Sequence, residues 1–101
     1  MKKLLIAALI LIPISAHCAE DWQENCEVVG DLAYAIMHAR QQGAPLPAIM
    51  EVAADDELSR KMVADAYDLP KYTLDESKAE AADEFRDKWY LDCYKVLTEN
   101  K

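Results

Sequence analysis

Apolar residues recur every three or four positions over two long stretches of this chain, the spacing of one face of an α-helix. In the stretch 21–42 this stripe consists of Trp22, Cys26, Val29, Ala33 and Ile36. In the stretch 74–98 it consists of Ala82, Phe85, Trp89, Cys93 and Val96. Because each stripe carries one cysteine among large side chains, we expect two long helices that pack together and are joined by a Cys26–Cys93 disulfide.

Two shorter helices are predicted between the long ones. The first covers 47–54, with Pro47 as its first residue and Ile49, Met50 and Ala53 facing inward. The second covers 56–69, begins at an N-cap supplied by Asp55 or Asp56, and ends before Pro70. Its expected inward stripe is Leu58, Met62 and Ala66, flanked by Val63 and Tyr67.

Glycine and capping residues agree with these boundaries. Gly43 is placed to end the first long helix as its C′ residue, and Gly30 within that helix favours a close approach of a neighbouring helix. The segment Thr73–Glu76 matches a capping box that opens the last helix. No stretch alternates as a strand does, so we expect an all-α fold: a compact four-helix arrangement with two long terminal and two short central helices.

The first nineteen residues read as a signal peptide. Lys2 and Lys3 precede the apolar run Leu4–Ile12, which is too short to span a membrane, and small residues follow. Cleavage is predicted after Ala19, with Cys18 as the alternative, which leaves a single helical domain over 20–101. Lipid anchoring at Cys18 is disfavoured because His17, not a small residue, precedes it. The mature protein is expected in the periplasm or outside the cell.

The net charge limits which classes of partner the protein can bind, and the cysteine content indicates the compartment in which it folds. The full chain has 11 basic and 19 acidic residues. Losing Lys2 and Lys3 with the signal makes the net charge more negative, from −8 to −10. Such an acidic balance argues against nucleic acid and anionic membranes as partners. One disulfide fits an oxidising compartment, and closing a loop of about 60–70 residues contributes about 4 kcal/mol in the chain-entropy model.

No catalytic or metal-binding pattern is recognisable. His38 is the one histidine outside the signal, and Met37-His38 lacks a third ligand. Asp55-Asp56-Glu57 lacks the spacing of a calcium loop, and capping explains it better. Neither Ser59 nor Ser77 has a histidine partner at a known spacing. We therefore expect no enzymatic activity, no catalytic residue, no metal and no cofactor.

Several segments together are similar to a known group of proteins. They are Cys26, Leu32-Ala33, Ile36-Met37, Arg40-Gln41, Ala66-Tyr67, Glu84-Phe85 and Cys93-Tyr94. In these the chain resembles small uncharacterised exported proteins of bacterial and prophage genomes, a resemblance that implies a helical disulfide fold and no activity. A looser likeness, in size and class alone, is to acid-stress periplasmic chaperones.

Two functions remain open on the sequence alone. The leading hypothesis is a non-catalytic interaction module, an inhibitor or accessory factor of an envelope or extracellular protein, which would bind through the segment Pro45–Tyr72. Loops punctuated by proline often carry function, and four large side chains lie there. They are Leu46, Met50, Tyr67 and Tyr72. The alternative is an acid-stress periplasmic holdase chaperone that loses its negative charge near the sequence pI of about 4.6.

Overall fold

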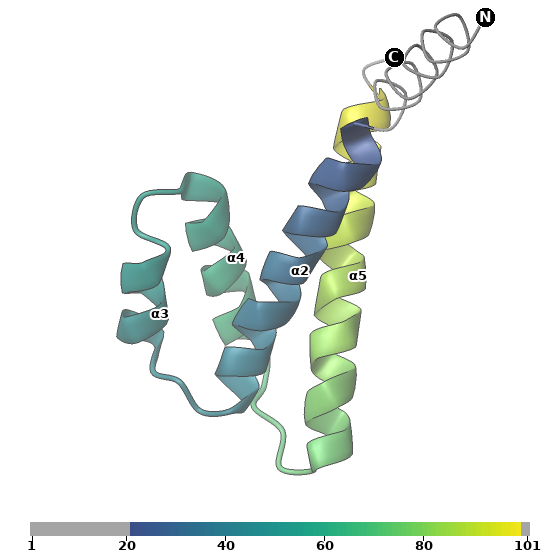
Figure 1. Ribbon diagram of the computed structural model, residues 1–101. Helices are drawn as coiled ribbons and strands as arrows, with labels where there is room; N and C mark the ends of the chain where they lie inside the picture. The colour runs from purple at the N-terminus through teal and green to yellow at the C-terminus, as the bar shows by residue number, and fades with distance from the viewer. Residues whose placement is uncertain (1–20, 100–101) are drawn as a thin grey trace, which may run out of the picture.

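The computed structural model describes residues 21–99, which form four α-helices and no β-strand within that range (Figure 1). The helices are α2 (Asp21–Gln41), α3 (Leu46–Val52), α4 (Glu57–Asp68) and α5 (Asp75–Glu99). The predicted all-α fold with two long terminal and two short central helices is therefore confirmed. The predicted signal peptide, residues 1–19, lies outside the described residues.

The two long helices are antiparallel neighbours along their whole length, as the dark blue and yellow-green ribbons of Figure 1 show. The shorter α3 and α4 form a second pair, and α4 packs against the carboxyl-terminal half of α2. The opposite end of the α2–α5 pair extends past this second pair. We call this extension, residues 21–29 of α2 and 90–99 of α5, the arm.

The hydrophobic core lies where all four helices meet. Its buried members are Ala33, Ile36, Met37, Ala53, Met62, Val63, Ala66, Ala82 and Phe85. Trp89 and Val29 are partly buried against this cluster and mark the boundary between the core and the arm. The core therefore stabilises one end of the long helix pair, not its full length.

Two side chains that the helical periodicity placed in the core are exposed instead. Val96 is 62% exposed, because it lies in the arm, beyond most of the α3–α4 pair. Leu58 is 42% exposed, because the first turn of α4 diverges from α2, and Ser59 is buried in its place. Helical spacing identifies the face that points toward a neighbour, but it does not say whether a second neighbour covers that face.

The predicted roles of Gly30 within α2 and of Gly43 just after it are confirmed. Gly43 adopts a φ of +93°, the left-handed conformation that suits the C′ residue of a helix. Gly30 is buried beneath α5, and a β-carbon there would lie 3.2 Å from the Cγ atom of Arg86. The missing side chain thus allows α2 and α5 to approach closely next to the arm.

Of the two predicted N-caps, one is confirmed and one is wrong. Asp56 caps α4 by accepting a hydrogen bond from the Ser59 amide at 3.3 Å. The predicted capping box at Thr73 does not open α5, because that helix begins at Asp75 and the Leu74 carbonyl accepts from the Lys78 amide. Leu74 therefore occupies the position before the helix that Thr73 was expected to take.

Candidate interaction surfaces

The predicted disulfide joins the two long helices within the arm. Cys26 of α2 and Cys93 of α5 are bonded, with their Cα atoms 5.5 Å apart. Cys26 is fully buried, whereas Cys93 is only partly buried. The bond therefore fixes the arm from its interior and leaves one sulfur-bearing side chain near the surface.

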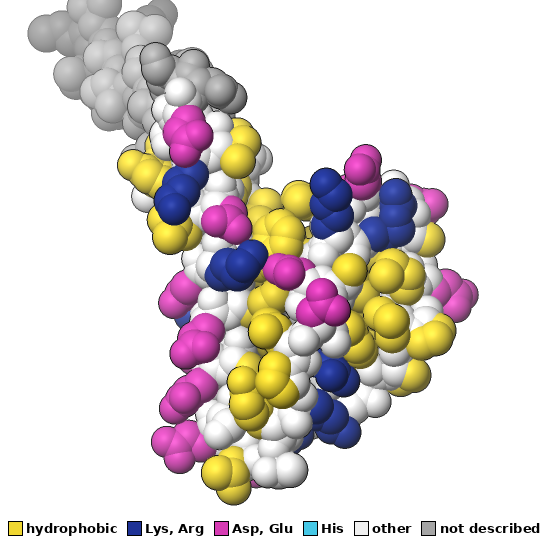
Figure 2. All heavy atoms as spheres, turned by 180° about the vertical axis from the view of Figure 1, so that it is seen from behind, with side chains coloured by type: hydrophobic (Ala, Val, Ile, Leu, Met, Phe, Trp, Pro, Cys, Tyr) yellow, Lys and Arg dark blue, Asp and Glu magenta, His cyan; other side chains and the backbone are white. Residues whose placement is uncertain are grey.

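An apolar groove of about 330 Å³ lies beside the disulfide. We call it the distal groove; it is lined by Asn25 and Val29 of α2, Leu58 of α4, and Trp89, Asp92, Cys93, Val96 and Leu97 of α5. In Figure 2 hydrophobic side chains gather in the notch between the arm and the α3–α4 pair. The two exposed side chains that departed from the helical prediction, Leu58 and Val96, both line it. Sequence reasoning missed this groove; the only available signal was that the α5 stripe continues past Cys93.

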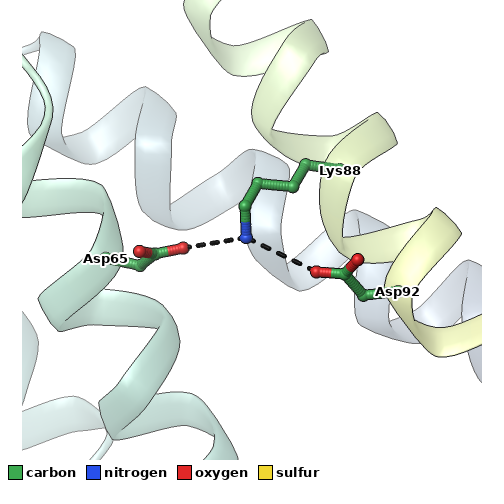
Figure 3. A network of polar contacts seen from close by, with 3 residues as sticks. All are labelled: Asp65, Lys88 and Asp92. Atoms are coloured by element: carbon green, nitrogen blue, oxygen red, sulfur yellow. Dashed lines mark hydrogen bonds and ion pairs between the residues drawn. The ribbon is translucent and has the colours of Figure 1, made fainter. Parts of the chain in front are cut away.

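A small network of charges connects α4 and α5 (Figure 3), and one of its members, Asp92, lines the distal groove. The Lys88 ammonium contacts Asp65 of α4 at 3.1 Å and Asp92 of α5 at 3.4 Å. Desolvation lowers the pKa of Lys88, but the hydrogen bonds and charges of the two carboxylates outweigh it and leave the pKa raised above its ordinary value. The network bridges α4 and α5, and its two carboxylates outnumber its one cation.

The four residues predicted to bind a partner have different environments. Leu46 and Tyr72 are 41% and 40% exposed, so they are available to another molecule. Met50 is partly buried and packs against the core, as does Tyr67. Tyr72 also lines a second groove of about 500 Å³ between the loop before α5 and α5 itself, where Glu80, Glu84 and Lys88 make the wall more polar. The structure thus leaves two of the four residues exposed.

Tyr67 has a structural role at the end of α4. Its hydroxyl donates a hydrogen bond to the Ala44 carbonyl at 2.6 Å, and the Arg40 guanidinium lies 4.9 Å from the centre of its ring. Arg40 also donates to the Leu69 carbonyl at 3.1 Å. Burial raises the pKa of Tyr67, and the nearby Arg40 charge opposes this shift. These contacts tie α4 to the end of α2, so Tyr67 is a poor position at which to test partner binding.

Gln41 anchors the loop that leads into α5, a role that the sequence did not reveal. Its side chain is 1% exposed, donates to the Pro70 carbonyl at 2.9 Å and accepts from the Tyr72 amide at 2.8 Å. The Lys78 ammonium donates to its backbone carbonyl at 2.7 Å. Because a buried amide needs both donor and acceptor partners, this arrangement positions Tyr72 relative to α2.

The residues considered for chemistry have other roles in the structure. The ring of His38, an exposed residue, stacks on Tyr34 with the ring centres 6.1 Å apart. The Ser59 hydroxyl donates to Asp56. Within residues 21–99, no group of three or more histidine, cysteine, aspartate or glutamate side chains is placed to hold a metal ion. In the same range, no helix is long and apolar enough to cross a membrane.

Comparison with known proteins finds no match to this chain: no family model, no curated protein and no solved structure is similar to it. The surfaces described above are therefore the basis for any statement about function.

Proposed function

We propose that this protein is a non-catalytic exported interaction module, an inhibitor or accessory factor of an envelope or extracellular protein. The observation that carries the proposal is the distal groove, an apolar concavity outside the core. Partner proteins commonly insert apolar side chains into such concavities. We expect the occupant to be an apolar segment of the partner protein.

The disulfide supports this function because it limits the motion of the groove walls. Asn25 and Val29 on one side and Cys93 and Leu97 on the other belong to helices that the bond joins covalently. A surface that is already ordered loses less conformational entropy when it binds. An oxidising compartment, which the predicted signal peptide implies, would keep the disulfide formed and this surface rigid.

The test is affinity capture from an envelope extract with the wild type and two variants. Leu58→Glu places a negative charge on the groove wall. The new carboxylate lies in the first turn of α4, where the helix dipole favours negative charge, so the helix should still form. Val52→Glu is the matched control, because Val52 is 86% exposed and lines neither groove. A partner retained by the wild type and the control but lost by folded Leu58→Glu supports the module. Equal retention by all three would remove the groove from the proposal.

The predicted surface at 45–72 is tested in the same experiment by a second set of variants. Leu46→Ala and Tyr72→Ala remove the two exposed side chains and avoid the structural contacts of Tyr67. Tyr72 keeps its backbone bond to Gln41 in the variant, so the loop is expected to stay in place. Loss of a partner in this double variant, with full retention in Leu58→Glu, would move the binding surface to this segment.

An acid-activated holdase is the alternative function. It is favoured by large apolar side chains that are already exposed, of which Val28, Leu74 and Val96 are more than 60% exposed. Protonation of the carboxylates would remove the negative charge that keeps such surfaces apart. Protection of a client protein from aggregation at about pH 3 but not at about pH 7 would support it, and absence of protection at both would exclude it.

A further inference from the structure

We propose that the Cys26–Cys93 disulfide is a redox latch: its reduction by a dithiol opens the arm and dissolves the distal groove while the core stays folded. Opening of the arm on reduction is argued from the structure alone. The effect of this opening on partner binding rests on the proposed function. The first observation is the distribution of burial. Among the described side chains of the arm, only Cys26 is fully buried, whereas the core cluster lies entirely outside the arm.

The noncovalent contacts within the arm are weak. The Trp22 ring meets the Tyr94 ring edge to face with the centres 5.0 Å apart, but Trp22 is only partly buried and Tyr94 is 41% exposed. The arm consists of the terminal turns of α2 and α5, and helix ends that lack extensive tertiary packing open at low free energy. Without the covalent bond, the arm therefore belongs to the part of the molecule that opens at the lowest free energy.

The distal groove depends on the same bond. Asn25 and Val29 form one wall, and Asp92, Cys93, Val96 and Leu97 form another. These residues lie in the arm, and only Leu58 and Trp89 come from outside it. When the arm opens, the two walls separate, so the groove exists only in the oxidised protein.

Access to the bond is asymmetric, which determines how it is reduced. Cys93 is partly buried and lines the groove, while Cys26 has no exposed surface. A thiolate of the dithiol therefore attacks the Cys93 sulfur, and Cys26 leaves as a thiolate that takes a proton from water. The second thiolate of the dithiol then displaces Cys93 from the mixed disulfide. The protein gains two electrons and the dithiol is released as a disulfide, so electrons balance.

The test is hydrogen exchange at low temperature on oxidised and dithiol-reduced protein, in the full chain carrying Cys18→Ser so that Cys18 cannot exchange. On reduction, amides at 21–29 and 90–99 should exchange almost as fast as in an unfolded chain. The core segments 33–41, 59–66 and 82–89 should stay protected, at a level lowered only by the loss of global stability that removal of the bond causes. The Cys26→Ala, Cys93→Ala variant should give the same pattern without any reductant. Unchanged protection in the arm, or loss of protection in the core as well, would overturn the proposal.

Two further readouts separate the latch from a general loss of stability. In Trp89→Phe the remaining Trp22 reports on the arm, and its emission should shift to the red on reduction. In Trp22→Phe the remaining Trp89, packed against the core, should shift much less. A monothiol in place of the dithiol should form a mixed disulfide on Cys93; an adduct found on Cys26 instead would contradict the predicted route of attack.

These results are independent of partner binding. If the arm opens on reduction but no partner is captured by the oxidised protein, the latch holds and the proposed function fails. If a partner is captured equally well by oxidised and reduced protein although the arm has opened, the function holds and the control of the groove by the latch is wrong.

Discussion

The two ends of the α2–α5 pair have the same helical pattern but are stabilised in different ways. At the core end, nine buried apolar side chains meet, eight from α2, α4 and α5 and the ninth, Ala53, from the end of α3, and the buried amide of Gln41 holds the adjoining loop. In the arm, the same two helices contact mainly each other, through one fully buried side chain, the Trp22–Tyr94 ring contact and the disulfide. The difference shows that the number of neighbouring elements, not the amphipathic pattern, decides how much of a helix face becomes core.

The consequence for function is that each end has a different use. At the core end α3 and α4 cover the apolar stripes of the long helices, and the groove beside Tyr72 has polar as well as apolar walls. The arm cannot bury its stripes completely and so exposes the distal groove, with the disulfide compensating for the missing contacts. The predictions below test this division, from the largest expected effect to the smallest.

Substitution of one apolar side chain on α5 should have a large effect in the core and a small effect in the arm. Phe85→Ala removes a ring that is 2% exposed and should lower the free energy of unfolding by about 3–5 kcal/mol. Leu91→Ala is the control in the arm, where the side chain is 49% exposed, and should change it by less than about 0.5 kcal/mol. Urea unfolding followed by circular dichroism measures both. If both variants lost a similar free energy of unfolding, side chains in the arm would contribute as much to stability as those in the core.

Removal of the disulfide should lower global stability as well as open the arm. Cys26→Ala with Cys93→Ala should reduce the free energy of unfolding by about 2–4 kcal/mol, because the unfolded chain regains the entropy that the closed loop had removed. Thermal unfolding with and without a reductant is the measurement. The reductant should lower the melting temperature of the wild type and leave that of the double variant unchanged. A wild type insensitive to reduction would show that the bond contributes nothing to the fold.

The loop anchor at the core end can be tested with two adjacent glutamines. Gln41→Ala leaves the Pro70 carbonyl and the Tyr72 amide without their partner, which should cost about 2 kcal/mol. Gln42→Ala changes an exposed neighbour at the same helix end and should stay within about 0.5 kcal/mol of the wild type. If both variants unfold at the same urea concentration, Gln41 does not anchor the loop.

The smallest effect concerns the cap of α4 and its dependence on pH. The hydrogen bond from the Ser59 side chain, aided by the backbone amides, holds the pKa of Asp56 below the ordinary value of 3.8. A carboxylate with a lowered pKa stabilises the fold above its unfolded pKa, and this contribution is lost as the pH falls through its folded pKa. Asp56→Ala should therefore lower the urea midpoint at neutral pH and have progressively less effect below about pH 3.8. Asp55→Ala should leave the midpoint unchanged at every pH, and a drop equal to that of Asp56→Ala would reassign the cap.

Local patterns predicted most of the secondary structure because helix formation and termination depend on nearby residues. This holds for the apolar periodicity of α2 and α5, for the left-handed conformation of Gly43 and for the end of α4 before Pro70. Each of these features is determined by residues that lie close together in the sequence. Asp56 as the cap of α4 followed from the same logic. Two start signals were misplaced by one residue: α5 starts one residue later than the capping box at Thr73 required, and α3 begins at Leu46, so Pro47 is its second residue and not the predicted first.

Long-range packing decided what the local patterns could not. The stripes identified the inward faces of α2 and α5 and the Cys26–Cys93 bond, since a helix face is a property of spacing along the chain. Whether Leu58 of α4 and Val96 of α5 would be covered depended on where α3 and α4 lie relative to the long helices, and so did the buried position of Gln41. The distal groove arises from this placement of four helices of unequal length, which periodicity along a single helix does not contain.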